Sequence, residues 1–260
     1  DAGKSLVEHP DVDKICFTGG QKTGKLIMKW TSQNLQKVSL DIGGRSPNII
    51  MNDADLDLAL SCSADACFLS SGQCCFAGGR VFVHESIYDK FVEDAVKMAK
   101  SRKVGCPYEE GVKHGPLISQ AQLDKVTKYI ENGKRDKARL LCGGVREGEK
   151  GFFVENTIFA DVTDKMYIAN YEVFGPVMCI MKFSNLDEVI QRVNKSKSSL
   201  GCGVLTQSLE TALEVSSKLK SGTVLVNCWS SLEPTTPIGG FKESGIGREL
   251  GEESLQDYLE

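Results

Sequence analysis

Residues 38–83 run VSLDIGGRSPNIIMNDADLDLALSCSADACFLSSGQCCFAGGRVFV, and the alternation of apolar runs within them indicates the class of fold. Short runs of β-branched and aliphatic residues at 37–40, 48–51 and 81–83 predict three strands. Residues 56–69, between the last two strands, are typical of a helix, because aspartates precede them at the positive end of the helix dipole. A strand, a helix and another strand in this order predict a βαβ unit with parallel strands.

The same alternation continues on both sides of this stretch. Further strands are predicted at residues 14–17, 140–142, 152–154, 177–181, 203–206 and 223–228. Further helices, with apolar side chains at helical spacing, are predicted at residues 22–30, 88–102, 120–138, 186–194 and 209–219. We therefore expect an α/β fold with a largely parallel sheet.

The composition argues against several classes of protein. Hydrophobic residues make up 41% and charged residues 25% of the chain, which is ordinary for a globular protein with a real core. The net charge is −4, with 31 basic and 35 acidic residues intermixed, so neither a nucleic-acid partner nor a membrane partner is expected. No apolar run reaches the roughly 18–20 residues that span a bilayer, and the first residues do not resemble a signal peptide. We expect a cytoplasmic protein.

Ten cysteines are scattered through the chain without C-x-x-C pairs. We interpret them as free thiols in a reducing compartment, with a disulfide framework as the alternative. The histidines are His9, His84 and His114, and none has a second histidine or a cysteine pair at ligand spacing. No metal site is predicted.

The segment GGQKTGKL, residues 19–26, follows a predicted strand and opens a predicted helix. It fits the phosphate-binding frame G-x-x-x-x-G-K, but Leu26 stands where a Ser or Thr would bind magnesium. A nucleoside triphosphatase is therefore disfavoured. Two interpretations stay open: Gly19, Gly20 and the helix N-terminus approach a dinucleotide phosphate, or the segment is a plain turn.

Two adjacent cysteines, Cys74 and Cys75, follow a Gly-Gln turn. A thiolate in such a loop is a strong nucleophile if local donors lower its pKa, and two buried structural cysteines are the alternative. Asp41 precedes a Gly-Gly turn between two strands and could act as a general base on water. The Cys–His pair of a protease is disfavoured, because no histidine has suitable neighbours.

Two further segments are YEVFGP at 171–176 and PIGGFKESGIGRELGE at 237–252. Each alone is typical of a turn, and only their order and spacing relative to the other motifs make them candidate site segments. The order GGQKTG, LDIGGRSPNII, SGQCC, EVFGP and PIGGFKESGIGRELGE resembles the aldehyde dehydrogenase superfamily, closest to its NAD-dependent cytosolic and mitochondrial branch. The resemblance runs over essentially all 260 residues and implies the C-terminal half of a family member. It implies the end of a Rossmann-like cofactor domain at 1–42, an α/β catalytic domain at 43–240, and a segment at 241–260 that returns towards the cofactor domain.

The resemblance also implies a reaction: oxidation of a small-molecule aldehyde to a carboxylic acid with NAD, or with NADP, by a homodimer or homotetramer. Cys75 would be the nucleophile, Asp41 the base that activates water for thioester hydrolysis, and Glu249 a nearby carboxylate that helps to shuttle protons. The implied cofactor contacts are Gly19 and Gly20 at the pyrophosphate, Glu172 at the nicotinamide ribose and Phe174 beside the nicotinamide.

Several positions depart from the family pattern. Asp41 replaces a glutamate, so the carboxylate is withdrawn by roughly 1.5 Å, and a misplacement of about 1 Å can cost on the order of 10²-fold in rate. Gly20 and Gln21 stand where Ser-Thr is usual. The positions expected around the substrate entrance also differ: Leu69, Phe76, Leu232 and Ile238.

These departures leave two interpretations. One is an enzyme with a reshaped pocket, whose activity is weakened by the shorter Asp41. The other is a structural derivative of the family with little or no activity, like the omega-crystallins of cephalopod lenses.

Overall fold

The computed structural model describes residues 2–229 and 232–259. Its larger unit is built on a seven-stranded sheet of order β12-β11-β3-β4-β9-β8-β7. Neighbouring strands are parallel, except that β7 runs antiparallel to β8 at one edge. The strands are β3 (Pro47–Ile50), β4 (Arg80–His84), β7 (Arg139–Cys142), β8 (Thr157–Ala160), β9 (Val177–Phe183), β11 (Gly201–Leu205) and β12 (Thr223–Val226).

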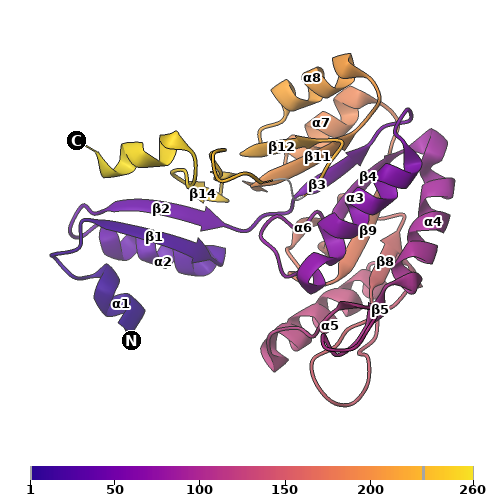
Figure 1. Cartoon of the computed structure of the whole chain (residues 1–260), viewed down its shortest axis with the longest axis horizontal. Coiled ribbons are helices and arrows are strands. Elements are labelled where there is room, and N and C mark those ends of the chain that lie inside the picture. Colours follow the sequence, from indigo (N-terminus) through magenta and orange to yellow (C-terminus); the bar gives the residue numbers. More distant parts are fainter. Residues whose placement is uncertain (1, 230–231, 260) are drawn as a thin grey trace.

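Helices cover both faces of this sheet (Figure 1). Two helices pack on one face, α3 (Leu56–Phe68) and α4 (Tyr88–Ser101). Four pack on the other, α5 (Gln120–Arg135), α6 (Tyr167–Asn170), α7 (Leu186–Asn194) and α8 (Leu209–Lys218). Because side chains alternate along a strand, Val81 and Val83 of β4 pack in the core beneath α3 and α4, and Phe82 packs in the core on the opposite face.

The smaller unit combines the two ends of the described chain (Figure 1). Its elements are α1 (Ala2–Val7), β1 (Lys14–Gly19), α2 (Gln21–Thr31), β2 (Lys37–Ile42) and β14 (Gly245–Ile246). The sheet order is β1-β2-β14, with β14 antiparallel to β2. A 3₁₀ helix, η3 (Glu252–Tyr258), follows β14. Its Asp257 forms an ion pair with Lys14 of β1, with 3.0 Å between Oδ2 and Nζ. The C-terminal segment therefore lies against the first strands of the chain.

Short elements complete the architecture. Two-stranded sheets are formed by β5 (Lys103–Val104) with β6 (Val112–His114), and by β10 (Ser198–Ser199) with β13 (Phe241–Lys242). Short 3₁₀ helices span Leu69–Gly72 and Glu85–Ile87. Among the helices that the structure describes, none combines the length and apolar character needed to cross a membrane.

The predicted α/β fold with a largely parallel sheet is confirmed. One predicted strand, at residues 152–154, is wrong. This run lies in a loop after Gly151, whose φ is +75°, and only Val154 forms an isolated bridge, to Arg146. The strand between β9 and β7 is instead β8 (Thr157–Ala160), a short and wholly buried run that the sequence analysis missed. The domain boundaries at residues 42 and 240 stay predictions.

Candidate active site

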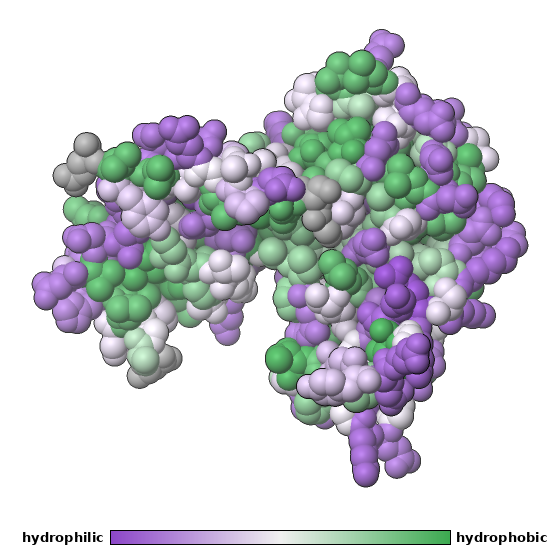
Figure 2. Space-filling view, in the orientation of Figure 1, coloured by the Kyte–Doolittle hydropathy of each residue, from purple (hydrophilic) through white to green (hydrophobic). Residues whose placement is uncertain are grey.

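Segments far apart in the sequence meet at a cavity of about 580 Å³, whose walls come from both units. The molecular surface is hollowed between the two units (Figure 2). Six residues singled out from the sequence line the cavity: Gly19, Gly20, Asp41, Cys75, Glu172 and Phe174. Its other lining residues are Thr18, Gly43, Gln73, Cys74 and Lys125. Tertiary structure thus gathers one nucleophile candidate, two carboxylates and a glycine-rich turn around one space.

The cysteine loop is held by an unusual left-handed turn. Ser70, Ser71 and Gly72 have φ values of 53°, 58° and 68°. This conformation costs roughly 1–2 kcal/mol for a residue that carries a Cβ. Gly72 is also crowded, because a Cβ there would lie 2.2 Å from the carbonyl oxygen of Gly175. The turn therefore packs the cysteine loop tightly against the loop that contains Glu172.

The two thiols of this loop influence each other. A hydrogen bond from Cys75, together with the backbone N–H of Phe76, lowers the pKa of Cys74 to about 6. The same hydrogen bond to Cys74, burial, and the negative charges of Cys74 and Asp41 raise the pKa of Cys75. The pair therefore loses a first proton near neutral pH and holds the second strongly.

Asp41 lies at the end of β2, opposite Gly245 of β14. Its Oδ1 is buried and has no hydrogen-bond partner among the residues that the structure describes. Burial raises the pKa of Asp41, and the negative charge of Glu249 raises it further. Glu249 is fixed by backbone hydrogen bonds of 2.8 Å in both directions with Ile238. A carboxylate whose pKa is raised towards neutrality is a better general base than one in water.

Glu172 is the second carboxylate that lines the cavity. Its carboxylate lies against Gly43, where a Cβ would be 2.5 Å from Oε1. Burial raises the pKa of Glu172, and the positive charges of Lys125 and Arg45 oppose this rise. A carboxylate placed at the cavity wall is free to accept hydrogen bonds from a hydroxylated ligand.

Phe174 adopts φ +54°, which is rare for a bulky side chain. Gln122 of α5 stabilises this conformation, since its Nε2 donates to the carbonyl of Val173 at 3.1 Å and to that of Phe174 at 2.6 Å. The strain is thus held by a specific side chain at the cavity wall, as is common at functional sites.

Gly19 and Gly20 end β1 and open α2. Gly20 is the N-cap of α2, has no side-chain capping bond, and faces open space, since an added Cβ would meet nothing within 4 Å. The first backbone N–H groups of α2 are therefore available at the cavity, and such a helix start attracts anions.

Comparison with known proteins identifies the family of this chain. All 260 residues match the aldehyde dehydrogenase family. The chain belongs to this family. It is 48% identical over 260 residues to aldehyde dehydrogenase 1A1 of Rattus norvegicus, covering all of this chain and 52% of that protein. It is 47% identical to the mitochondrial benzaldehyde dehydrogenase of Antirrhinum majus, covering all of this chain and 49% of that protein.

Solved structures of the family agree with this assignment. The NAD+ complex of an aldehyde dehydrogenase from Bacillus cereus matches 100% of this chain and 53% of its own, with a TM-score of 0.98 at 45% identity. Betaine aldehyde dehydrogenase from Staphylococcus aureus, in complex with NAD+, matches 100% of this chain and 52% of its own, with a TM-score of 0.97 at 37% identity. The chain spans about half the length of the curated relatives it matches. These comparisons give no support to the lens-crystallin alternative.

The residues expected at the substrate entrance are dispersed. None of Leu69, Phe76, Leu232 and Ile238 is among the residues described as lining the 580 Å³ cavity. Leu69 and Leu232 are surface-exposed, and Ile238 pairs with Glu249. Phe76 is only 5% exposed, and its ring packs so closely on Gly201 that a Cβ there would lie 2.5 Å away. The structure therefore buries Phe76 against Gly201 and does not place it in the lining of this cavity.

Two residues of the site escaped the sequence analysis. Lys125 lines the cavity and Gln122 holds its wall, both from the predicted helix at 120–138. On an amphipathic helix, polar residues at these positions look like an ordinary solvated face. Their only local signal is their position near the helix start, which does not distinguish them from other surface residues.

Proposed function

We propose that the full-length protein oxidises aldehydes to carboxylic acids with NAD, and that Cys75 is the nucleophile. The observation that carries the proposal is the single cavity shared by Cys75, Asp41 and Glu172. Its volume of about 580 Å³ lies in the range of roughly 300–1,000 Å³ that ligand pockets occupy. The B. cereus relative supports NAD, since its structure is an NAD+ complex. Homodimer or homotetramer assembly and a cytoplasmic location stay predictions.

The residues present fit a dinucleotide. The uncapped start of α2 at Gly20 suits a pyrophosphate, and the carboxylate of Glu172 suits ribose hydroxyls. The ring of Phe174 offers a flat apolar surface to a nicotinamide. When bound, NAD supplies an acceptor for the hydride that leaves the substrate carbon.

Cys75 would attack the aldehyde carbonyl and, after oxidation, would carry the acyl group as a thioester. The family resemblance and the pKa values favour different sulfur atoms. Family resemblance assigns the nucleophile to the second cysteine, whereas the hydrogen bond between the thiols makes Cys74 the first to ionise. Both cysteines line the cavity, so substituting each one in turn distinguishes the two assignments.

Asp41 would then activate the water that hydrolyses the thioester. Its buried and unpartnered Oδ1 is suited to accept a proton from water, and its raised pKa favours the transfer. The side chain is shorter than the family's glutamate by one methylene, so we propose that hydrolysis of the thioester, not its formation, limits turnover.

NAD-dependent oxidation by the full-length protein tests this function. Cys75→Ser should abolish turnover, while Cys74→Ser, the matched neighbour, should retain it. Asp41→Glu should raise the steady-state rate by on the order of 10-fold or more and leave the first turnover unchanged. Loss of turnover in Cys74→Ser alone would move the nucleophile to Cys74. Absence of both activity and NAD binding in the wild type and in Asp41→Glu would refute the proposed function.

A further inference from the structure

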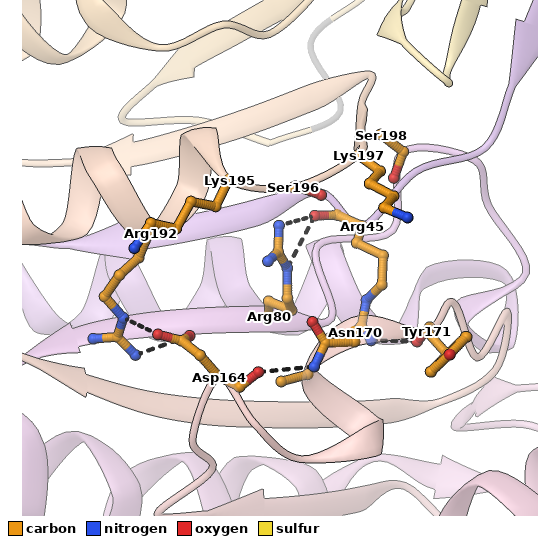
Figure 3. Close-up of a pocket in the computed structure, with 11 residues that line it drawn as sticks. Arg45, Arg80, Asp164, Asn170, Tyr171, Arg192, Lys195, Ser196, Lys197 and Ser198 are labelled. Atoms are coloured by element: carbon orange, nitrogen blue, oxygen red, sulfur yellow. Dashed lines mark hydrogen bonds and ion pairs between the residues drawn. The ribbon is translucent and has the colours of Figure 1, made fainter.

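A second cavity of about 520 Å³ lies apart from the first, and the two share no lining residue among those that the structure describes. Its lining comes from Arg45 before β3, Arg80 at the start of β4, Asp164 after β8, the end of α6 and the loop that follows α7. Figure 3 shows the arginines at its centre and the residues of that loop above them. Five of its lining side chains are basic: Arg45, Arg80, Arg192, Lys195 and Lys197.

The only carboxylate described in this lining is already engaged. Asp164 accepts from Nε of Arg192 at 2.8 Å and from its Nη2 at 3.3 Å (Figure 3). Arg192 also pairs with Glu188 at 2.9 Å. Asp164 also acts on Arg80 through its charge, so within the described lining one carboxylate faces five cations, and the cavity has a positive potential.

Two of these cations are buried. Arg45 and Arg80 are 9% and 7% exposed, and neither forms an ion pair within residues 2–229 and 232–259. Arg80 donates through Nε and Nη2 to one acceptor, the carbonyl oxygen of Arg45, at 3.1 and 2.6 Å. The guanidinium of Arg45 donates through Nη1 to the carbonyl oxygens of Ile168 and Tyr171. Arg45 also forms side-chain hydrogen bonds with Tyr129 and Cys179, whereas no hydrogen bond of Nη1 of Arg80 is described within those ranges.

A buried guanidinium without an anion is costly, because burial removes water from a charge that arginine keeps under nearly all conditions. Burial and the neighbouring charge of Arg45 lower the pKa of Arg80 to about 9. An oxyanion in the cavity would relieve it, since guanidinium groups bind carboxylates and phosphates through paired hydrogen bonds.

We propose that this cavity binds a phosphate group, free or carried by a small molecule. The buried guanidinium groups of Arg45 and Arg80 would hold it from below, and the loop after α7 would close over it with Lys195 and Lys197. A phosphate has enough charge and enough acceptor oxygens for these donors and for the hydroxyls of the same loop. A single carboxylate, with one charge, would leave most of the positive charge uncompensated.

Calorimetric titration of the full-length protein with inorganic phosphate tests this site. The variant Lys195→Ala/Lys197→Ala removes two exposed cations from the cavity rim without disturbing a buried group. The matched control Lys113→Ala/Lys150→Ala removes two exposed lysines elsewhere. Titrations are repeated with saturating NAD, because phosphate could also enter the first cavity. A phosphomonoester such as glycerol phosphate forms a second arm and distinguishes a free phosphate from an organic one.

The proposal predicts saturable binding of one phosphate, and this binding should persist with NAD. Its affinity should weaken at least roughly fivefold in the rim variant and stay unchanged in the control. Tighter binding of the phosphomonoester would assign the site to an organic phosphate. No saturable binding, or equal weakening in both double variants, would overturn it. The readout is heat of phosphate binding, so its result is independent of aldehyde oxidation.

Discussion

The carboxylate of Glu172 occupies the space that a side chain on Gly43 would need. A Cβ built on Gly43 would lie 2.5 Å from Oε1 and 3.3 Å from the carboxylate carbon. Gly43 belongs to the Gly-Gly turn after Asp41. This turn positions two carboxylates: β2 ends beside Asp41, and the missing side chain of Gly43 leaves room for Glu172.

Gly43→Ala should therefore push the carboxylate of Glu172 away from the cavity while the fold persists, because the atom it meets is the end of a flexible side chain. A hydrogen bond to a charged group contributes about 1.5–3 kcal/mol, so NAD affinity should fall on the order of tenfold or more. Gly115→Ala is the control, since its Cβ would meet only Pro107 at 3.4 Å. Equal NAD affinity of both variants, measured by fluorescence titration, would contradict the proposed role of Glu172.

Glu249 should control the pH dependence of hydrolysis through Asp41. Its negative charge disfavours a second negative charge nearby and so raises the pKa of Asp41. Glu249→Gln removes this charge, and the pKa of Asp41 should fall. Because the base acts when deprotonated, the acidic limb of the rate profile should move to lower pH. Glu252→Gln, which removes an exposed carboxylate three residues away, should leave the profile in place; a shift of the same size there would refute a specific effect of Glu249.

Cys75→Ala should change the ionisation of its neighbour. The hydrogen bond from Cys75 is the largest effect that lowers the pKa of Cys74 to about 6, so its loss should raise that pKa towards the value of a free thiol. Alkylation of Cys74 against pH, resolved by peptide mass spectrometry, measures the change. Cys142→Ala, at a half-buried thiol of β7, should not alter the profile. An unchanged profile in Cys75→Ala would show that backbone donors, not the neighbouring thiol, stabilise the Cys74 thiolate.

Gly72→Ala should destabilise the fold more than an equivalent change at Gly111. Both glycines have a left-handed φ, +68° and +78°, so alanine costs about 1 kcal/mol of conformational energy at either position. At Gly72 the added Cβ would also lie 2.2 Å from Gly175, whereas at Gly111 it would meet nothing within 4 Å. The difference in free energy of unfolding, from urea denaturation, should be about 1–3 kcal/mol. Equal losses would mean that the two loops are not rigidly packed.

Local patterns were sufficient for most of the fold. The helix at residues 186–194 was predicted with the bounds that the structure shows, because its apolar side chains recur on one face and a polar cap precedes it. The strand at 157–160 was missed, since a short buried run has no alternation to mark it. The neighbouring aromatic run at 152–154 was equally apolar but is placed in a loop by Gly151.

The sequence alone was sufficient for the family, through the order of its motifs, and for the α/β fold, through the alternation of strands and helices. It also singled out six of the residues that line the first cavity, because turns and strand ends are set by nearby residues. Only the tertiary structure decided which side chains share a space. Lys125 joins the site from a helix about 50 residues away from Cys75, and Phe76, next to the proposed nucleophile, is buried. The basic cavity likewise exists only because strand starts and a distant loop converge. The burial of a side chain and the electrostatic effect of its neighbours depend on distances in space. They therefore follow from the packing of the fold and not from the position of a residue in the chain.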